Sequence, residues 1–419
     1  MNLATDFLNK RIVPTLTALS ENTYMSAIRA GMVAVVPLTI IGGFFIIVSY
    51  FPITGWDKIV APYLQLLQVP VTATFGLLAV FVCFAIGYDL GKQLQQEAIV
   101  SASMATAVFL MIQLKLGEKP EDISFSMDTL GSKGLFTAIL IALISVRVQK
   151  FFSDKNFVIK LPANVPPVVY ESFLSLSPLF FLVLVFWVIR FVLGVDIDHI
   201  VTTAFKPVVR ALDTLPGILV YAFLVTILWS VGINGDNAMD AIVAPIFLQF
   251  LAANVEAASA HQPMPYITAL GFFTIFVNVG GTGATIALAL IMLNSKEPGF
   301  RKVSRLSLPT QIFQINEPIF FGFPIVLNPI FMIPYILNAL ILTAGTYLLM
   351  SWGVIHKPFV NVPWTTPPII GHYLVSGGDW KAAVWGVISI VIAMIVYFPF
   401  AKAAERQRLK AEAAGTAHE

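Results

Sequence analysis

Long apolar runs separated by short polar stretches recur along most of the chain. Many of these runs approach the roughly 20 residues that a helix needs to cross a bilayer. They do not alternate apolar and polar residues in segments of about ten, as membrane β-barrels do. The pattern therefore predicts an all-α, polytopic membrane protein. Regular runs lie at about 27–50, 71–90, 97–114, 134–152, 172–193, 216–233, 327–351 and 381–401.

Between residues 233 and 327 the pattern becomes irregular. Apolar runs at about 238–258, 266–279 and 280–294 are interrupted by the sequence Gly280-Gly281-Thr282-Gly283. Two alternatives fit: a re-entrant hairpin with two short spans, or two longer spans. Since broken helices frame substrates in transporters, we expect the site in this irregular half.

Two amphipathic stretches accompany the regular runs, one before the first run and one between the runs at 172–193 and 216–233. The first twenty residues predict a short helix on the membrane surface, and residues 196–213 predict a connector that lies along it. The chain thus divides into a regular half (1–195), a connector (196–213), a half with broken helices (214–402) and a charged tail (403–419), where a helix frays.

Composition and charge agree with a membrane protein. Apolar residues make up 58% of the chain and charged residues only 11%, against about 25% charged in soluble domains. The net charge of +2 gives no reason to expect nucleic acid. Cys83, the single cysteine, excludes an internal disulfide and is expected to be a buried, inert thiol. No cleavable signal peptide is evident.

The basic residues of the short loops indicate the orientation. With about ten spans, most of them fall on one side, which is the cytoplasmic side by the positive-inside rule. Both termini are then cytoplasmic. The basic residues that fall on the cytoplasmic side are Lys10, Arg11, Lys150, Lys155, Lys160, Lys296, Arg301, Lys302, Arg305, Lys402, Arg406, Arg408 and Lys410.

The segment from Phe313 to Pro324 is the strongest candidate for a site. It places Glu317 among aromatic and aliphatic residues and next to Pro318, which interrupts a helix. A carboxylate in an apolar membrane setting is costly and marks a functional position. The functional interpretation of Glu317 is an acceptor of sugar hydroxyls, or of a proton from one, with Asn316 beside it. The alternative is a structural carboxylate bonded to backbone amides at the break.

A second segment resembles the first. Asn234, Asp236 and Asn237 follow an isoleucine at a helix break, just as Asn316 and Glu317 do. They either contact the substrate or cap the helix that starts near residue 238, since Asn and Asp are good N-caps. Asp240 and Glu256 are interpreted as helix-end or loop charges in water.

The block Asn278–Gly283 looks like a phosphate loop but lacks the lysine of a P-loop. A turn or close helix packing is an equal alternative, and Thr282 is retained as a candidate substrate contact. Trp364 offers an aromatic plane on which a sugar can stack, or an anchor at the membrane interface. His356 and His372 flank the same loop and are interpreted as surface or structural histidines.

These motifs carry a resemblance. From about residue 9 to 402 the chain resembles the membrane-embedded IIC component of the bacterial phosphoenolpyruvate-dependent sugar phosphotransferase system, in its lactose/cellobiose/chitobiose branch. Four blocks in the family's order support it: Gly232–Asn237, Asn278–Gly283, Gln314–Gly322 and Pro363–Pro368.

The resemblance implies an inward-facing homodimer in the bacterial cytoplasmic membrane, with about ten spans and two re-entrant hairpins. The first half forms the dimer contact, and the second half binds one β-linked disaccharide, of the cellobiose or diacetylchitobiose type. Glu317 matches the family's sugar-binding glutamate and Trp364 an aromatic residue near the sugar. No metal or cofactor is implied.

The partner implied is a phosphorylated IIB protein, with IIA, HPr and enzyme I upstream. Its phosphocysteine transfers phosphate to the 6-hydroxyl of the sugar, because this chain has no cytoplasmic cysteine for that role. We expect docking on Lys296–Arg305 and the basic tail, assisted by charge.

One departure from the family concerns the base. Many members have a histidine where this chain has Asn234, and an asparagine cannot accept a proton at neutral pH. Glu317, Asp236 or the oxygens of the phosphocysteine remain as proton acceptors. Two other functions stay open: a secondary transporter driven by protons through Glu317, and a sugar-sensing membrane protein.

Overall fold

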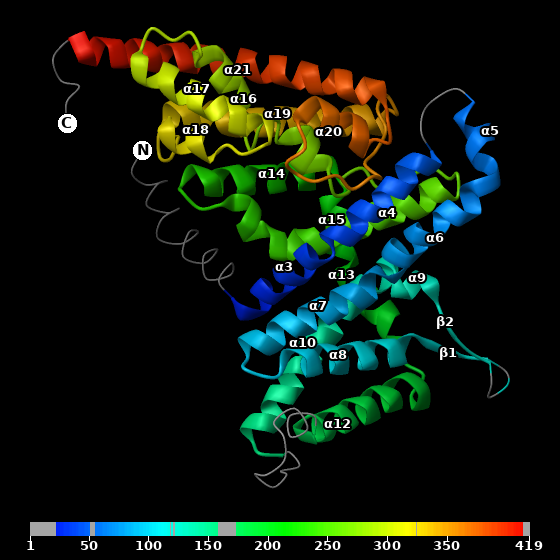
Figure 1. Cartoon of the computed structure of the whole chain (residues 1–419). Helices are drawn as coiled ribbons and strands as arrows, with labels where there is room; N and C mark the ends of the chain where they lie inside the picture. Colours follow the sequence, from blue (N-terminus) through cyan, green and yellow to red (C-terminus); the bar gives the residue numbers. More distant parts are fainter. Residues whose placement is uncertain are drawn as a thin grey trace.

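The computed structural model describes residues 22–50, 55–117, 119, 122–157, 173–323 and 325–413. The predicted helix in the first twenty residues lies outside this part of the chain. Helices dominate the described residues, with two halves joined through α13 (Figure 1).

The first half is a bundle built around α7. Neighbours of α7 in this bundle are α3, α8 and α10, and Cys83 is buried on α7 as predicted (Figure 1). The bounds are α3 Thr23–Ala34, α4 Val36–Ser49, α5 Trp56–Val60, α6 Leu64–Thr74, α7 Leu78–Gln93, α8 Ala98–Gln113, α9 Met127–Leu130, α10 Leu135–Asp154 and α12 Leu176–Trp187, with short 3-10 turns at Ala61–Tyr63, Phe75–Leu77 and Ser132–Gly134 and a π turn at Val188–Val192.

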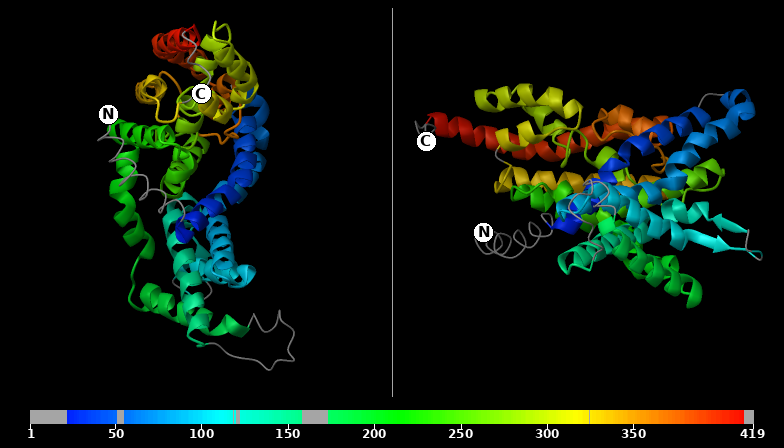
Figure 2. Two further views of the ribbon diagram at one scale, coloured as in Figure 1. Left: turned by 90° about the vertical axis from the view of Figure 1, so that its left-hand side faces the viewer. Right: turned by 60° about the horizontal axis from the view of Figure 1, so that its bottom comes forward.

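A small β-hairpin corrects the all-α prediction. Strand β1 (Leu114–Leu116) pairs antiparallel with β2 (Ile123–Phe125), and the hairpin projects from the bundle (Figure 2). Both strands have apolar residues at every second position, the period of a β-strand. The prediction overlooked this short alternation because the segment lies in an acidic loop between long apolar runs.

The second half contains both long and interrupted elements. α13 fills the range predicted for the connector, and α14 and α19 pack side by side, as do α19 and α21. The bounds are α13 Ile197–Leu212, α14 Leu215–Ser230, α15 Gly235–Ser259, a π turn at Phe272–Val277, α16 Ile286–Met292, α17 Pro298–Ile312, α18 Glu317–Gly322, α19 Pro329–Ser351, α20 Pro368–Val375 and α21 Trp380–Ala413.

The irregular region contains one long helix followed by short pieces. α15 runs unbroken over 25 residues, but the helical segments after it are only a six-residue π turn and the seven-residue α16. The structure therefore matches neither alternative in full, because one long helix is followed by short pieces, and the division of this region into spans and hairpins stays a prediction. At the other end of the chain, α21 continues past residue 402 to Ala413, so the helix extends into the expected tail.

Within the described residues, six helical segments are long and apolar enough to cross a membrane, or seven if the bent pair Leu176–Val192 and Ile197–Leu212 is one span. α8 and α14 are shorter apolar helices. The expected total of about ten spans, with cytoplasmic termini, stays a prediction.

Candidate functional site: a polar cavity between the two halves

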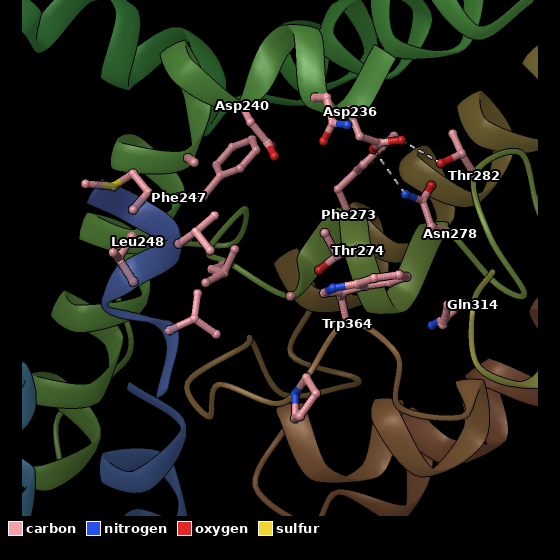
Figure 3. A pocket seen from close by; sticks show the side chains of 18 of the residues that line it. Asp236, Asp240, Phe247, Leu248, Phe273, Thr274, Asn278, Thr282, Gln314 and Trp364 are labelled. Atoms are coloured by element: carbon pink, nitrogen blue, oxygen red, sulfur yellow. Dashed lines mark hydrogen bonds between the residues drawn. The ribbon is translucent and has the colours of Figure 1, made fainter. Parts of the chain in front are cut away.

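A cavity of about 470 Å³ lies where the broken segments of the second half face α3 and α4. Its volume falls in the range of about 300–1,000 Å³ that is usual for small-molecule sites. All seven residues predicted from the sequence line it: Asn234, Asp236, Asn237, Thr282, Asn316, Glu317 and Trp364. The structure thus brings together side chains from four separate blocks of sequence (Figure 3).

Asp236 is the most firmly held of the carboxylates that line the cavity. Its Oδ2 atom accepts hydrogen bonds from Trp229 Nε1 at 2.8 Å and from Thr282 Oγ1 at 2.7 Å. Asn278 Nδ2 lies 3.5 Å from Oδ1 (Figure 3). Donors from α14 and from the glycine block therefore fix this negative charge and orient the Thr282 hydroxyl.

Asn234 is the N-cap of α15. Its side-chain oxygen accepts the backbone N–H of Asn237 at 2.9 Å, so the capping interpretation is confirmed. The same residue also lines the cavity, as does the exposed side chain of Asn237. The two alternatives raised by the sequence are thus compatible.

Glu317 differs from the expectation in its surroundings. It begins α18, and its side chain is exposed at the cavity rather than buried among its apolar neighbours. Among the described residues, its carboxylate has no hydrogen bond or ion pair. Asn316, directly before it, is buried and donates from Nδ2 to the Thr282 carbonyl at 2.9 Å. The backbone at this break is therefore anchored while the carboxylate remains available.

Trp364 presents its indole to the cavity. The residue is 57% exposed, and Figure 3 shows its ring lying across the space near Phe273 and Thr274. The loop that carries it is tied to α4, because Asn361 Nδ2 donates to Thr39 Oγ1 at 2.7 Å. This arrangement offers a flat apolar surface beside polar groups.

The glycine block forms a tight turn, as one of the two interpretations predicted. Gly281 and Gly283 have φ angles of 103° and 77°, which side chains rarely adopt. A Cβ atom at Gly281 would lie 2.4 Å from Asn316, and one at Gly283 would lie 2.3 Å from the Tyr335 ring. The turn therefore needs glycine both for its conformation and for close packing behind the cavity.

The sequence interpretation missed several polar residues of the cavity. Asp240 lines it from α15 instead of lying in water, and the charge of Arg29 on α3 is near enough to interact with it. Thr39 on α4 and Gln314, just after the end of α17, also line it, as do Thr274, Asn278 and Asn361. Arg29 and Thr39 belong to the half for which no part in the site was expected. Asp240 lies four residues after Asp236, which places both on one helix face, and this spacing was a usable signal.

The flanking histidines lie outside the lining. His372 is fully buried on α20 and packs edge-on against Phe276, with ring centroids 4.7 Å apart. His356 contributes a backbone N–H to Asp379. Both observations agree with structural roles. Glu256, interpreted as a charge in water, is exposed on α15 and accepts a hydrogen bond from Ser132.

No group of three or more His, Cys, Asp or Glu side chains that could hold a metal ion is found among the described residues. The cavity offers hydrogen-bonding capacity, an aromatic face and the Glu317 carboxylate, which makes no hydrogen bond or ion pair within the described residues. This set suits a neutral, polyhydroxylated ligand.

Comparison with known proteins agrees with this chemistry. A family model described as "Phosphotransferase system, EIIC" matches residues 29–339. The chain is 33% identical to the lichenan permease IIC component of Bacillus subtilis (strain 168), covering 98% of this chain and 96% of the relative. It is 34% identical to the cellobiose-specific EIIC component of Geobacillus stearothermophilus, covering 97% and 95%.

A solved structure matches the whole fold. The crystal structure of the transporter ChbC, the IIC component from the N,N'-diacetylchitobiose-specific phosphotransferase system, superposes with a TM-score of 0.90 at 33% identity. The match covers 98% of this chain and 99% of that one. Together with the apolar helices, these matches make the protein a multi-pass protein of the cell membrane, and the chain belongs to the EIIC family of the phosphotransferase system.

Proposed function

We propose that this chain binds a β-linked disaccharide of the cellobiose or diacetylchitobiose type, carries it across the membrane and presents its 6-hydroxyl to a phosphorylated IIB protein. The observation that carries the proposal is the pairing of Glu317 and Trp364 in one cavity. A carboxylate accepts hydrogen bonds from sugar hydroxyls, and an indole stacks on the apolar C–H face of a sugar ring. The names of the relatives supply the class of sugar.

The two acidic residues have different roles in this proposal. Asp236 is engaged by donors on both oxygens and shapes the wall, together with Thr282. The Glu317 carboxylate accepts no hydrogen bond from the described residues, so in this proposal it receives a hydroxyl of the sugar and is the catalytic candidate. Because Asn234 cannot take a proton, Glu317 is the proton acceptor that the geometry favours over Asp236.

The proposed transfer of the phosphoryl group to the sugar requires no cofactor. The 6-oxygen of the sugar attacks the phosphorus of the IIB phosphocysteine, an O–P bond forms and the S–P bond breaks. The hydroxyl proton moves to the Glu317 carboxylate, and the cysteine leaves as a thiolate. The product is the sugar 6-phosphate, released on the cytoplasmic side.

Basic residues on α17, on the turn before it and on α21 form the proposed docking surface for IIB. Lys296, Lys302 and Arg305 are exposed, as are Arg406 and Arg408. The two helices are in contact, since the Arg408 guanidinium lies 5.4 Å from the centroid of the Phe300 ring (Figure 1). This surface would attract a phosphorylated partner by charge.

The first half would form the contact of a homodimer. The peripheral helix α12 exposes Phe180, Leu184 and Trp187, an apolar face that suits lipid or a second copy. The dimer, the inward-facing state and the cytoplasmic location of both termini belong to this proposal.

Radiolabelled disaccharides test the function directly. Purified protein in detergent is titrated with labelled cellobiose, competed by lactose, diacetylchitobiose and maltose, beside Glu317→Ala. We expect saturable binding displaced by a β-linked disaccharide and lost in the variant. In cells that also express IIB, label should accumulate only as sugar phosphate. Accumulation of unmodified sugar would instead support a secondary transporter.

A further inference from the structure

The amide of Gln314 is oriented by the glycine turn behind the cavity. Its Oε1 atom accepts the backbone N–H groups of Gly280 at 2.8 Å and Gly281 at 3.2 Å. Two donors can face only the oxygen of an amide, so the assignment of oxygen and nitrogen follows from the hydrogen bonds. The Nε2 group therefore points away from the turn.

That Nε2 group is a buried donor without an acceptor. Gln314 is 5% exposed, and no hydrogen-bond partner of Nε2 is found in the described part of the chain. The residue lines the cavity, and Figure 3 shows its amide nitrogen turned toward the side on which Trp364 lies. Buried polar groups in proteins are nearly always paired, so an unpaired donor at a cavity wall points to a ligand acceptor.

The backbone supplies a second, independent observation. Gln314 follows the end of α17 with a φ of 67°, and the next N–H, of Ile315, bonds back to the Thr310 carbonyl. This is the left-handed position after a helix where glycine is the usual residue. A glutamine there strains the backbone. A helix end alone would favour glycine, so the glutamine side chain has a use beyond ending the helix.

We propose that Gln314 donates a hydrogen bond from Nε2 to an oxygen of the bound disaccharide and thereby selects among β-linked sugars. The inference rests on the proposed function. In it, Gln314 donates a hydrogen bond to the sugar, whereas Glu317 accepts one from it. A site that bonds a particular sugar oxygen discriminates strongly against analogues that lack it. Gln314 is thus a specificity residue, held in place by the glycine turn.

The test combines a variant with altered sugars. Labelled cellobiose is displaced by a panel of monodeoxy cellobioses, each lacking one hydroxyl, from the wild-type protein and from Gln314→Met. The matched control is Gln311→Met. Gln311 also bonds to the glycine turn region, through Thr285 at 3.1 Å, but does not line the cavity. Size-exclusion profiles check folding.

We expect Gln314→Met to bind cellobiose at least about tenfold more weakly. The wild-type protein should penalise one deoxy sugar through this bond, and the variant should lose that penalty. Gln311→Met should keep the wild-type order of affinities. If Gln314→Met does not fold, Gln314→Glu keeps the acceptor for the turn, and its expected result is a changed order among the deoxy sugars.

The outcomes separate the two proposals. A folded Gln314 variant with the wild-type order and wild-type penalties would overturn the inference and leave the proposed function intact. A wild-type protein that binds no β-linked disaccharide would overturn both.

Discussion

The breaks before α15 and before α18 look alike in sequence but differ in structure. Each has Ile-Asn ahead of an acid. At the first, Asn234 caps its own helix, and the acid is held by donors from other elements. At the second, the asparagine reaches across to the Thr282 carbonyl, and Glu317 has no partner among the described residues. One break therefore fixes a charge for structure, while the other leaves a charge available to a ligand.

The largest effect is expected at the anchored acid. Asp236→Ala would leave Trp229 Nε1 and Thr282 Oγ1 without their acceptor, at a cost of about 1–3 kcal/mol for each buried donor. We expect a clear drop in the unfolding temperature, measured on the purified protein by size exclusion after heating. Asp236→Asn is the control, because an amide keeps one acceptor oxygen and should lose less stability. An unchanged melting profile for Asp236→Ala would remove the distinction between the breaks.

Glu317→Ala should show the opposite behaviour. A charge-assisted hydrogen bond is worth about 1.5–3 kcal/mol, or roughly one to two decades in affinity, and this carboxylate makes no hydrogen bond or ion pair among the described residues. We expect strongly weakened binding of labelled cellobiose with an unchanged unfolding temperature. Glu317→Gln is the matched variant, since it keeps shape and removes charge. A destabilised Glu317→Ala protein would mean that both acids are structural.

Thr282→Val tests the bond that links the two breaks, because Thr282 contacts residues at both of them. Its hydroxyl bonds Asp236 and its carbonyl accepts from Asn316. Valine removes only the hydroxyl, so we expect a loss of about 1.5 kcal/mol in the free energy of unfolding. Thr282→Ser keeps the hydroxyl and should restore stability. Equal stability of all three proteins would show that the bond to Asp236 contributes nothing.

The smallest effect is expected for Asn234→His. The resemblance to the family implies that histidine is accepted at this position, so we expect binding of labelled cellobiose to change by less than about tenfold. Loss of the side-chain cap should cost about 1 kcal/mol of stability. Titration of the variant beside the wild-type protein measures both. A folded variant that no longer binds sugar would contradict the alignment of this block.

The broken regions were predictable because their signals are local. Proline beside Glu317 and the run of glycines at 280–283 interrupt apolar sequence in a way that regular spans do not. Polar residues at such interruptions have few roles besides caps, anchors and ligand contacts. The seven candidates therefore lie around one cavity, although their division into anchored and available groups was not predictable.

The cavity residues that the sequence did not predict reach the cavity through contacts between distant parts of the chain. Arg29 reaches the cavity because α3 packs on α15, and Thr39 lies there on α4, where it accepts a hydrogen bond from Asn361. The periodicity of α3 and α4 does not predict these neighbours. The role of Gln314 depends on amides 34 and 33 residues earlier and on a positive φ angle. Such features depend on tertiary packing, so a single sequence does not display them.

The bond between Asn361 and Thr39 has a mechanical consequence. It joins two side chains that are 322 positions apart in the sequence, and both are nearly fully buried. The bond lies where the loop that carries Trp364 meets the first half. Sliding one wall of the cavity past the other would strand an amide and a hydroxyl, at about 1–3 kcal/mol for each group. In the proposed transport function, a cycle that separates the two walls would have to break this hydrogen bond and form it again for each sugar carried.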